Sequence, residues 1–191
     1  MKGRCAGLNV QRLKLPAMRA LPNPPPLPYL PKPMDIELLR TISILRELND
    51  AELAGVAALF TLRDAKAKEK VVEEGKPVTH LYIVCEGVAH VRRLAQKREM
   101  LLGRINKGMI FGEINLFDPG VSTATVYAMK DVKLAVCDYD TLRAYMSANP
   151  AAGYKIVTGM MGEMARRLRT TSARLANSIY WTAGETLNPA M

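Results

Sequence analysis

Histidine, cysteine and tryptophan are scarce in this 191-residue sequence, which contains 2, 3 and 1 of them. The two histidines, His80 and His90, are too few for a histidine-rich metal site, so we expect no bound metal. Cys5, Cys85 and Cys137 show neither metal-ligand spacing nor the dense pattern of a disulfide scaffold. Such sparse cysteines are typical of a reducing compartment, so the sequence predicts a cytoplasmic protein.

Long apolar runs and catalytic motifs are also missing. No apolar run approaches the length of about 18 residues that a membrane span needs. The sequence has no P-loop, no recognisable Ser/His/Asp set and no paired metal ligands. We therefore expect a protein that neither spans a membrane nor acts as an enzyme.

Acidic residues are absent from residues 1–34, which hold six lysines and arginines and eight of the twelve prolines. Proline removes backbone donors and favours extended polyproline geometry, so we expect this basic segment to be disordered. It could instead be an organellar presequence, a proline-rich ligand for an aromatic groove, or an over-extended start before a true initiator at Met34. The rest of the chain carries only +3 of the net charge of +9, so the charge does not indicate nucleic-acid binding.

From Asp35 onward the sequence shows first a helical and then a strand pattern. Ile36, Leu39 and Ile42 recur at helical spacing, and Asn49-Asp50 is typical of the cap of a second helix. Short apolar strands separated by glycine and charged turns follow between residues 62 and 138. They lie at residues 71–72, 81–84, 88–91, 100–102, 124–128 and 134–137. This pattern predicts an α+β fold built on an antiparallel roll, sandwich or barrel.

The rest of the chain is organised around the stretch Phe111–Val126. Between two apolar strands it contains Gly112, the carboxylate Glu113, and a run of short residues that includes Ser122-Thr123-Ala124. Backbone N–H groups in such a segment can surround a small anion, and glycine lets a ligand approach the main chain closely. Glu113 would then accept hydrogen bonds from a sugar-like diol.

These residues resemble the phosphate-binding cassette of the cyclic nucleotide-binding domain family, to which the bacterial catabolite activator protein belongs. The family pattern is F-G-E, two small or apolar residues, a short loop and R-[ST]-A, and the chain keeps Phe111-Gly112-Glu113 and Thr123-Ala124. Glu74-Gly75 and Leu81–Val84 precede them in the family's order, and the likeness extends over roughly residues 40–180. The resemblance implies an antiparallel double-stranded β-helix (a jelly-roll β-roll) flanked by N-terminal helices and a long C-terminal dimer helix.

At Ser122 the chain departs from the family, which has a phosphate-pairing arginine there. Without a charged partner, only backbone and hydroxyl hydrogen bonds replace the water around a bound phosphate. Arg104 or Lys107, which are near in sequence, could supply the charge, or both could be solvated charges at strand ends. We therefore expect cyclic AMP, cyclic GMP or a related nucleotide to bind weakly or with altered selectivity.

A long helix is predicted after Asn149-Pro150, a pair typical of a helix start. Apolar residues and one threonine then recur at alternating spacings of 4 and 3, which is a heptad seam. The seam consists of Val157, Met161, Met164, Leu168, Thr171 and Leu175. It predicts a parallel helix pair, and therefore a homodimer, through residues 154–178.

The same helix resembles the dimer helix of the family at Arg167 and at Thr171-Ser172. The resemblance implies that Arg167 helps at the binding site and that the Thr-Ser pair contacts adenine, although Thr171 could instead only fix the register of the helix pair. The ligand-binding residues that the resemblance implies are Phe111, Gly112, Glu113, Ile114, Asn115, Ser122, Thr123, Ala124, Arg167, Thr171 and Ser172.

DNA-binding members of the family continue beyond the position of Trp181 into a helix-turn-helix domain, and Thr182–Met191 is too short to supply a recognition helix. We therefore expect a stand-alone module without direct DNA binding. Its single domain should cover residues 35–181, with the roll at about 62–138 and the last helices at 139–181. The segments 1–34 and 182–191 are expected to be tails.

Two functions remain as hypotheses. In the first, the protein is a regulatory module that senses cyclic AMP, cyclic GMP or a related nucleotide. In the second, it is a ligand-independent, dimeric interaction module that binds an unidentified protein partner. Glu113 and Thr171-Ser172 favour the first hypothesis, whereas Ser122 favours the second.

Overall fold

The computed structural model describes residues 34–95 and 98–186, with side chains described up to Tyr180. The proposed N-terminal tail lies outside the described residues except for Met34, which is buried in the helical core. At the other end, the last helix continues to Thr186, into the proposed C-terminal tail. No helix in the described ranges is both long enough and apolar enough to cross a bilayer.

The domain begins with short helices that the sequence caps well. They are α1 (Ile36–Arg40), the 3-10 helix η1 (Ser43–Leu45) and α2 (Asp50–Ala57). Asn49 accepts a hydrogen bond from the backbone N–H of Glu52, and the Glu52 carboxylate accepts one from the N–H of Asn49. This reciprocal capping box satisfies two backbone donors that the helix itself cannot pair, which confirms the predicted start of the second helix.

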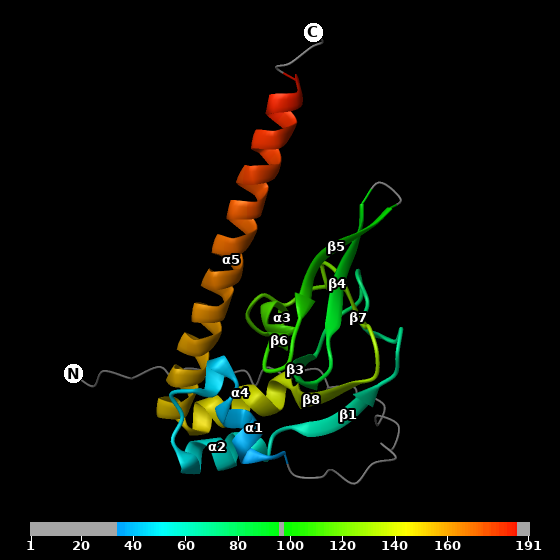
Figure 1. Ribbon diagram of the computed structural model, residues 1–191. Coiled ribbons are helices and arrows are strands. Elements are labelled where there is room, and N and C mark those ends of the chain that lie inside the picture. The colour runs from blue at the N-terminus through cyan, green and yellow to red at the C-terminus, as the bar shows by residue number, and fades with distance from the viewer. Residues whose placement is uncertain (1–33, 96–97, 187–191) are drawn as a thin grey trace, which may run out of the picture. The chain divides into compact units, whose positions relative to one another are not determined.

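Within the described residues, eight strands form two antiparallel four-stranded sheets (Figure 1). The strand order is β1-β8-β3-β6 in the first sheet and β2-β7-β4-β5 in the second. The chain therefore passes repeatedly from one sheet to the other, as in a jelly roll. The strands are β1 (Thr61–Ala65), β2 (Lys70–Val72), β3 (His80–Glu86), β4 (Ala89–Ala95), β5 (Arg98–Ile105), β6 (Ile110–Phe111), β7 (Thr125–Ala128) and β8 (Val132–Asp138). The predicted α+β class with an antiparallel β-roll is confirmed.

Two apolar cores hold this arrangement together. Alternating side chains of a strand point to opposite faces, so Val84 of β3 packs between the sheets whereas its neighbour Ile83 packs against the helices. The helical core also contains Leu53, Leu142 and Ile156, each no more than 1% exposed. Burying one such side chain contributes roughly 1.5–3 kcal/mol. The N-terminal helices and the last two helices are therefore fixed to the first sheet.

The last two helices are α4 (Tyr139–Ala148) and α5 (Pro150–Thr186), with proline at the first position of α5 as predicted. The first part of α5 packs against η1, and Gly159 permits this close approach. A Cβ atom at Gly159 would lie 2.4 Å from the backbone oxygen of Ile44. Because this backbone oxygen cannot swing aside, the first turns of α5 are held at one position on the helical core.

We expect Gly159→Ala to lower the free energy of unfolding by about 1–3 kcal/mol, the usual cost of overpacking a well-packed contact. Gly162→Ala, one turn later, is the matched control, since its Cβ would meet only the Arg166 guanidinium at 3.7 Å. There the better helix propensity of alanine should stabilise the protein by up to about 1 kcal/mol. Urea unfolding of both variants measures the difference. Equal effects at the two positions would show that α5 does not contact η1 as described.

Candidate ligand-binding site

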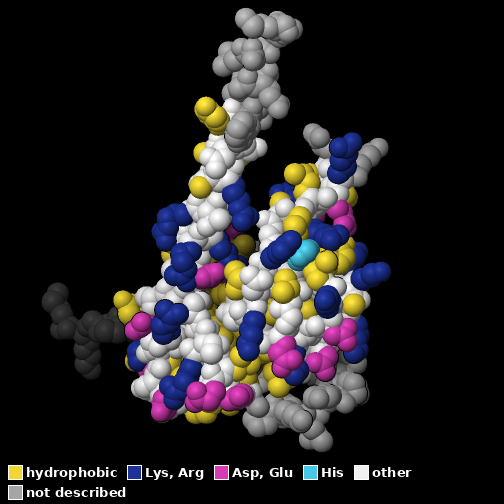
Figure 2. Space-filling view, viewed as in Figure 1, with side chains coloured by type: hydrophobic (Ala, Val, Ile, Leu, Met, Phe, Trp, Pro, Cys, Tyr) yellow, Lys and Arg dark blue, Asp and Glu magenta, His cyan; other side chains and the backbone are white. Residues whose placement is uncertain are grey.

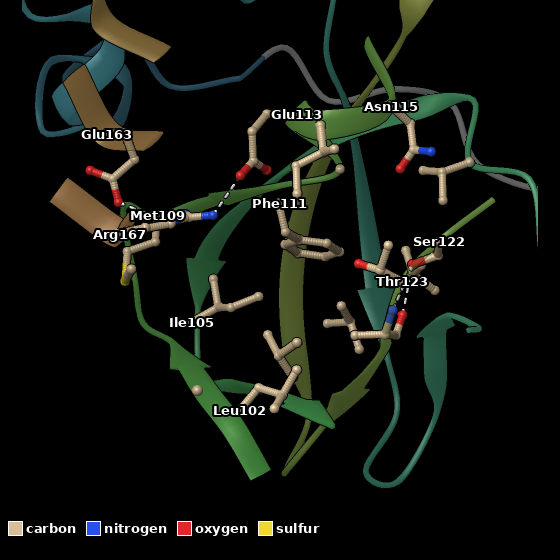
Figure 3. A pocket seen from close by; sticks show the side chains of 18 of the residues that line it. Leu102, Ile105, Met109, Phe111, Glu113, Asn115, Ser122, Thr123, Glu163 and Arg167 are labelled. Atoms are coloured by element: carbon tan, nitrogen blue, oxygen red, sulfur yellow. Dashed lines mark hydrogen bonds and ion pairs between the residues drawn. The ribbon is translucent and has the colours of Figure 1, made fainter. Parts of the chain in front are cut away.

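A cavity of about 590 Å³ lies among the β-roll, the loop before β7 and one face of α5. Figure 2 shows the surface hollowed beside α5, and Figure 3 shows the side chains around the hollow. Its floor is apolar. Phe111 stacks on Tyr82 with ring centroids 4.7 Å apart, and Leu102, Ile105 and Met109 also line the cavity. The polar groups are therefore confined to the cavity walls.

Gly112 shapes the wall that follows β6. Its φ angle of +84° is a left-handed conformation that favours glycine, and an added Cβ would lie 2.6 Å from the backbone oxygen of His80. The Tyr139 hydroxyl donates a hydrogen bond to the Gly112 carbonyl and holds the turn in place. The short helix α3 (Glu113–Phe117) starts directly after this turn. Glu113 is thereby aimed at the cavity from a rigid position.

Glu113 is a buried carboxylate with one charged partner. Its side chain is 5% exposed, and the Arg167 Nη1 atom donates a hydrogen bond of 2.7 Å to its Oε1 atom. Burial raises the pKa of the Glu113 carboxyl above its ordinary value, whereas the charge of Arg167 acts in the opposite direction. The Glu113 carboxylate, held by Arg167, is thus a hydrogen-bond acceptor in a region of low water content, and a hydroxyl group of a ligand can donate to it.

Arg167 is held from three sides. Its Nη2 atom donates to the Ile110 carbonyl oxygen at 2.5 Å, and its Nε atom donates to the Glu163 Oε1 atom at 3.2 Å. Arg166 pairs with the other oxygen of Glu163. Arg167 therefore links α5 to both β6 and α3, so a ligand that contacts Glu113 would also act on the position of α5.

The loop between α3 and β7 forms the opposite wall (Figure 3). The Asn115 side chain donates to the Gly120 carbonyl at 2.9 Å. The backbone N–H of Ser122 donates to the Lys76 carbonyl at 2.8 Å, and the Ser122 carbonyl accepts from the N–H of Gly75 at the same distance. The Ser122 hydroxyl donates to the Ala124 carbonyl at 2.7 Å. The loop is thus tied to the roll, but Ser122 brings no positive charge to it.

The structure brings together nearly all of the residues that the sequence analysis selected. Every one of them lines the cavity except Ser172. Ser172 lies one helical turn from both Leu168 and Leu175, on the exposed apolar face of α5. Thr171 lies at the border between that face and the cavity, so the two residues of the pair point in different directions.

Four residues of α5 that were not predicted from the sequence also line the cavity, namely Glu163, Arg166, Thr170 and Arg174. With Arg167 and Thr171 they repeat at spacings of three and four, which is one face of a helix. That periodicity was present in the sequence and would have identified them. Their position in one cavity with the segment that begins at Gly112, some fifty residues earlier, follows only from the three-dimensional fold.

Of the two cations considered as substitutes near Ser122, Arg104 lines the cavity and Lys107 does not. Arg104 stands directly opposite His90 in the β4–β5 ladder. Burial lowers the pKa of His90, and the charge of Arg104 acts in the same direction. The adjacent pair, Ala89 and Ile105, packs into the roll interior. Since side chains alternate along a strand, Arg104 shares the outer face with His90 and is not aimed at the Ser122 wall.

Comparisons with known proteins agree with this geometry. Residues 62–149 match the family described as the cyclic nucleotide-binding domain. The CRP-like cAMP-activated global transcriptional regulator of Mycobacterium tuberculosis is 30% identical over 145 residues, which are 75% of this chain and 63% of that regulator. The chain therefore spans less than two thirds of the length of this relative.

Solved structures show the same fold. The N-terminal domain of a transcriptional regulator from Streptomyces coelicolor A3(2) has a TM-score of 0.60 at 29% identity, over 72% of this chain and 94% of that chain. The catabolite activator protein of Thermus thermophilus has a TM-score of 0.64 at 22% identity, over 72% of this chain and 63% of that chain. Residues 62–149 of the chain therefore match the cyclic nucleotide-binding domain family, and they lie in a CRP-like β-roll.

Proposed function

We propose that this protein is a regulatory module that binds a cyclic nucleotide, cyclic AMP or cyclic GMP, in the cavity beside α5. The observation that carries the proposal is Glu113, a buried carboxylate that faces the cavity and is held by Arg167 at 2.7 Å. Glu113 accepts hydrogen bonds from the ribose hydroxyl. The phosphate lies against the loop that contains Ser122 and Thr123, both of which line the cavity.

Binding at this site is weak because the loop lacks a cation. A cyclic phosphate carries one negative charge, and moving it out of water is costly unless charged or hydrogen-bonding partners replace the water. The only acidic or basic side chain that lines the cavity from this loop is Asp118, which has the same sign of charge as the phosphate. The affinity therefore depends on the ribose contact with Glu113 and on the apolar floor under the base.

We expect Glu113→Gln to weaken cyclic nucleotide binding at least tenfold, because hydrogen bonds to a charged group contribute roughly 1.5–3 kcal/mol. Arg167 keeps Glu163 and the Ile110 carbonyl as partners, so the substitution leaves no unpaired buried charge. Glu47→Gln, an exposed substitution in the segment before α2, is the control. Isothermal titration with both nucleotides measures the change. A folded Glu113→Gln protein that binds as tightly as wild type would contradict the proposed role.

We further propose that the protein works as a homodimer through residues 154–178. Met161, Leu168 and Leu175 are 58%, 68% and 59% exposed, and they recur every seven residues along α5. Exposed apolar side chains with this period support a helix pair between two copies. Arg167 connects the same helix to Glu113, so ligand binding and pairing of the helices would influence each other.

A second candidate function is a ligand-independent, dimeric interaction module for an unidentified protein partner. One observation favours it: the Ser122 hydroxyl forms its hydrogen bond within the loop, to the Ala124 carbonyl. A hydroxyl that already donates a hydrogen bond within the loop is not available to donate one to a bound anion. In either case we propose a regulatory role in the cytoplasm, without catalysis and without direct DNA reading by this domain.

A further inference from the structure

Arg174 is a charged residue of the cavity that the proposed site does not use. It lines the cavity from α5, two helical turns after Arg167. The other α5 arginines of the cavity are paired, Arg166 with Glu163 and Arg167 with Glu113. Among the residues that the structure describes, no acidic side chain lies within ion-pair distance of Arg174. Its donors are therefore available to a ligand.

The position of Arg174 relates it to one part of the ligand. This step rests on the proposed function, in which the ribose lies at Glu113 and the phosphate lies at the Ser122 loop. Arg167 pairs with Glu113 and is therefore the residue of α5 beside the proposed ribose position. An α-helix rises about 1.5 Å per residue, so Thr171 and Arg174 lie about 6 Å and 10 Å beyond Arg167 along the helix axis. A base that extends from the ribose along this wall would lie over the floor of the cavity, where Leu102 is found (Figure 3). In this pose Arg174 would face an edge of the base.

The chemistry of arginine distinguishes between the two purines. A guanidinium has only donors, arranged in a rigid fork. Guanine presents two adjacent acceptors, N7 and O6, which match this fork, and arginine bidentate to these atoms is the commonest specific contact to guanine. Adenine presents the acceptor N7 beside the N6 amino donor, so one arm of the fork would meet another donor. We infer that Arg174 makes the site selective for a guanine cyclic nucleotide over its adenine counterpart.

Three nucleotides and two variants test this selectivity by titration. Wild-type protein should bind cyclic GMP about tenfold more tightly than cyclic AMP, which corresponds to 1.4 kcal/mol and is within the range for one bidentate pair. Cyclic IMP keeps N7 and O6 but lacks the 2-amino group, so it should bind like cyclic GMP. Arg174→Met keeps most of the side-chain bulk and should abolish the preference by weakening cyclic GMP. Arg169→Met, on the exposed side of the same helix and outside the cavity, should keep the preference.

Each alternative outcome has a distinct meaning. Equal affinities for cyclic GMP and cyclic AMP in wild type would overturn the inference and leave the proposed function standing. A preference that survives in Arg174→Met would also overturn it, because another group would then read the base. Equal weakening of all three nucleotides by Arg174→Met would show that its charge attracts ligands without reading them. No binding of any nucleotide to wild type would overturn both this inference and the proposed function.

Discussion

Replacing Ser122 with arginine should tighten cyclic nucleotide binding by about ten- to a hundredfold, since one charged hydrogen-bonding contact contributes roughly 1.5–3 kcal/mol. The backbone of Ser122 is fixed on both sides by its hydrogen bonds to Lys76 and Gly75, so a new side chain would start from a defined position. An arginine fork there can meet two phosphate oxygens at once. The substitution would supply the charge that the loop lacks.

The control for this substitution is Ser122→Ala. It removes the hydroxyl that bonds to the Ala124 carbonyl but adds no charge, so it separates the loss of the loop hydrogen bond from the gain of the cation. Isothermal titration of the three proteins with cyclic AMP and cyclic GMP provides the comparison. A folded Ser122→Arg protein that binds no better than wild type would show that the loop does not direct its side chain toward the phosphate.

Replacing Leu168 and Leu175 with lysine should convert the protein to monomers. The two side chains are 68% and 59% exposed in the single chain, so the monomer tolerates lysine there without loss of its core. In a parallel helix pair each lysine would face the same lysine of the second copy. Burying these like charges opposite each other would cost more free energy than the association of the two helices provides. Sedimentation velocity at tens of micromolar, a rough concentration for associations of ordinary strength, gives the oligomeric state.

Arg169→Ala is the matched control for the helix pair, because Arg169 is exposed on α5 but lies outside the predicted seam. It should leave the dimer intact. A wild-type protein that sediments as a monomer under these conditions would contradict the proposed homodimer. A dimer that survives both lysines would place the interface elsewhere on the molecule.

Local sequence signals predicted most of the fold. The capping box at Asn49, the glycine turns between strands and the proline at the start of α5 each act within a few residues, so their effect can be read from the sequence. Two elements of the cavity wall were missed. The strand β6 has two residues and the helix α3 has five, lengths over which no hydrophobic period can repeat.

The candidate site was predicted in part for the same reason. Gly112 and Glu113 belong to one short motif, and the structure puts both in the cavity wall. The ion pair between Glu113 and Arg167 joins residues 54 positions apart, and only the packing of α5 against the roll brings them to 2.7 Å. Arg174 stands on a helix face that periodicity can reveal, but its exposure to the cavity depends on that same packing.

Two adjacent faces of α5 connect the proposed ligand binding with the proposed homodimer. One face of the helix, with Arg167 and Arg174, lines the cavity, while the adjacent face, with Leu168 and Leu175, is exposed. Thr171 lies between them. A ligand that changes the rotation of α5 about its axis would therefore alter the apolar face that a second copy meets.

The most direct test of the account is an amide NMR titration of isotope-labelled wild-type protein with cyclic GMP, since it locates even a weak ligand. The account predicts shifts that saturate and cluster at Gly112–Asn115, Ser122–Ala124 and Thr170–Arg174, three segments that contribute residues to the cavity lining. Absence of shifts at about 10 mM nucleotide, above the millimolar range of weak binding, would contradict it. Shifts confined to segments outside the cavity, such as Ser43–Ala57, would contradict it equally.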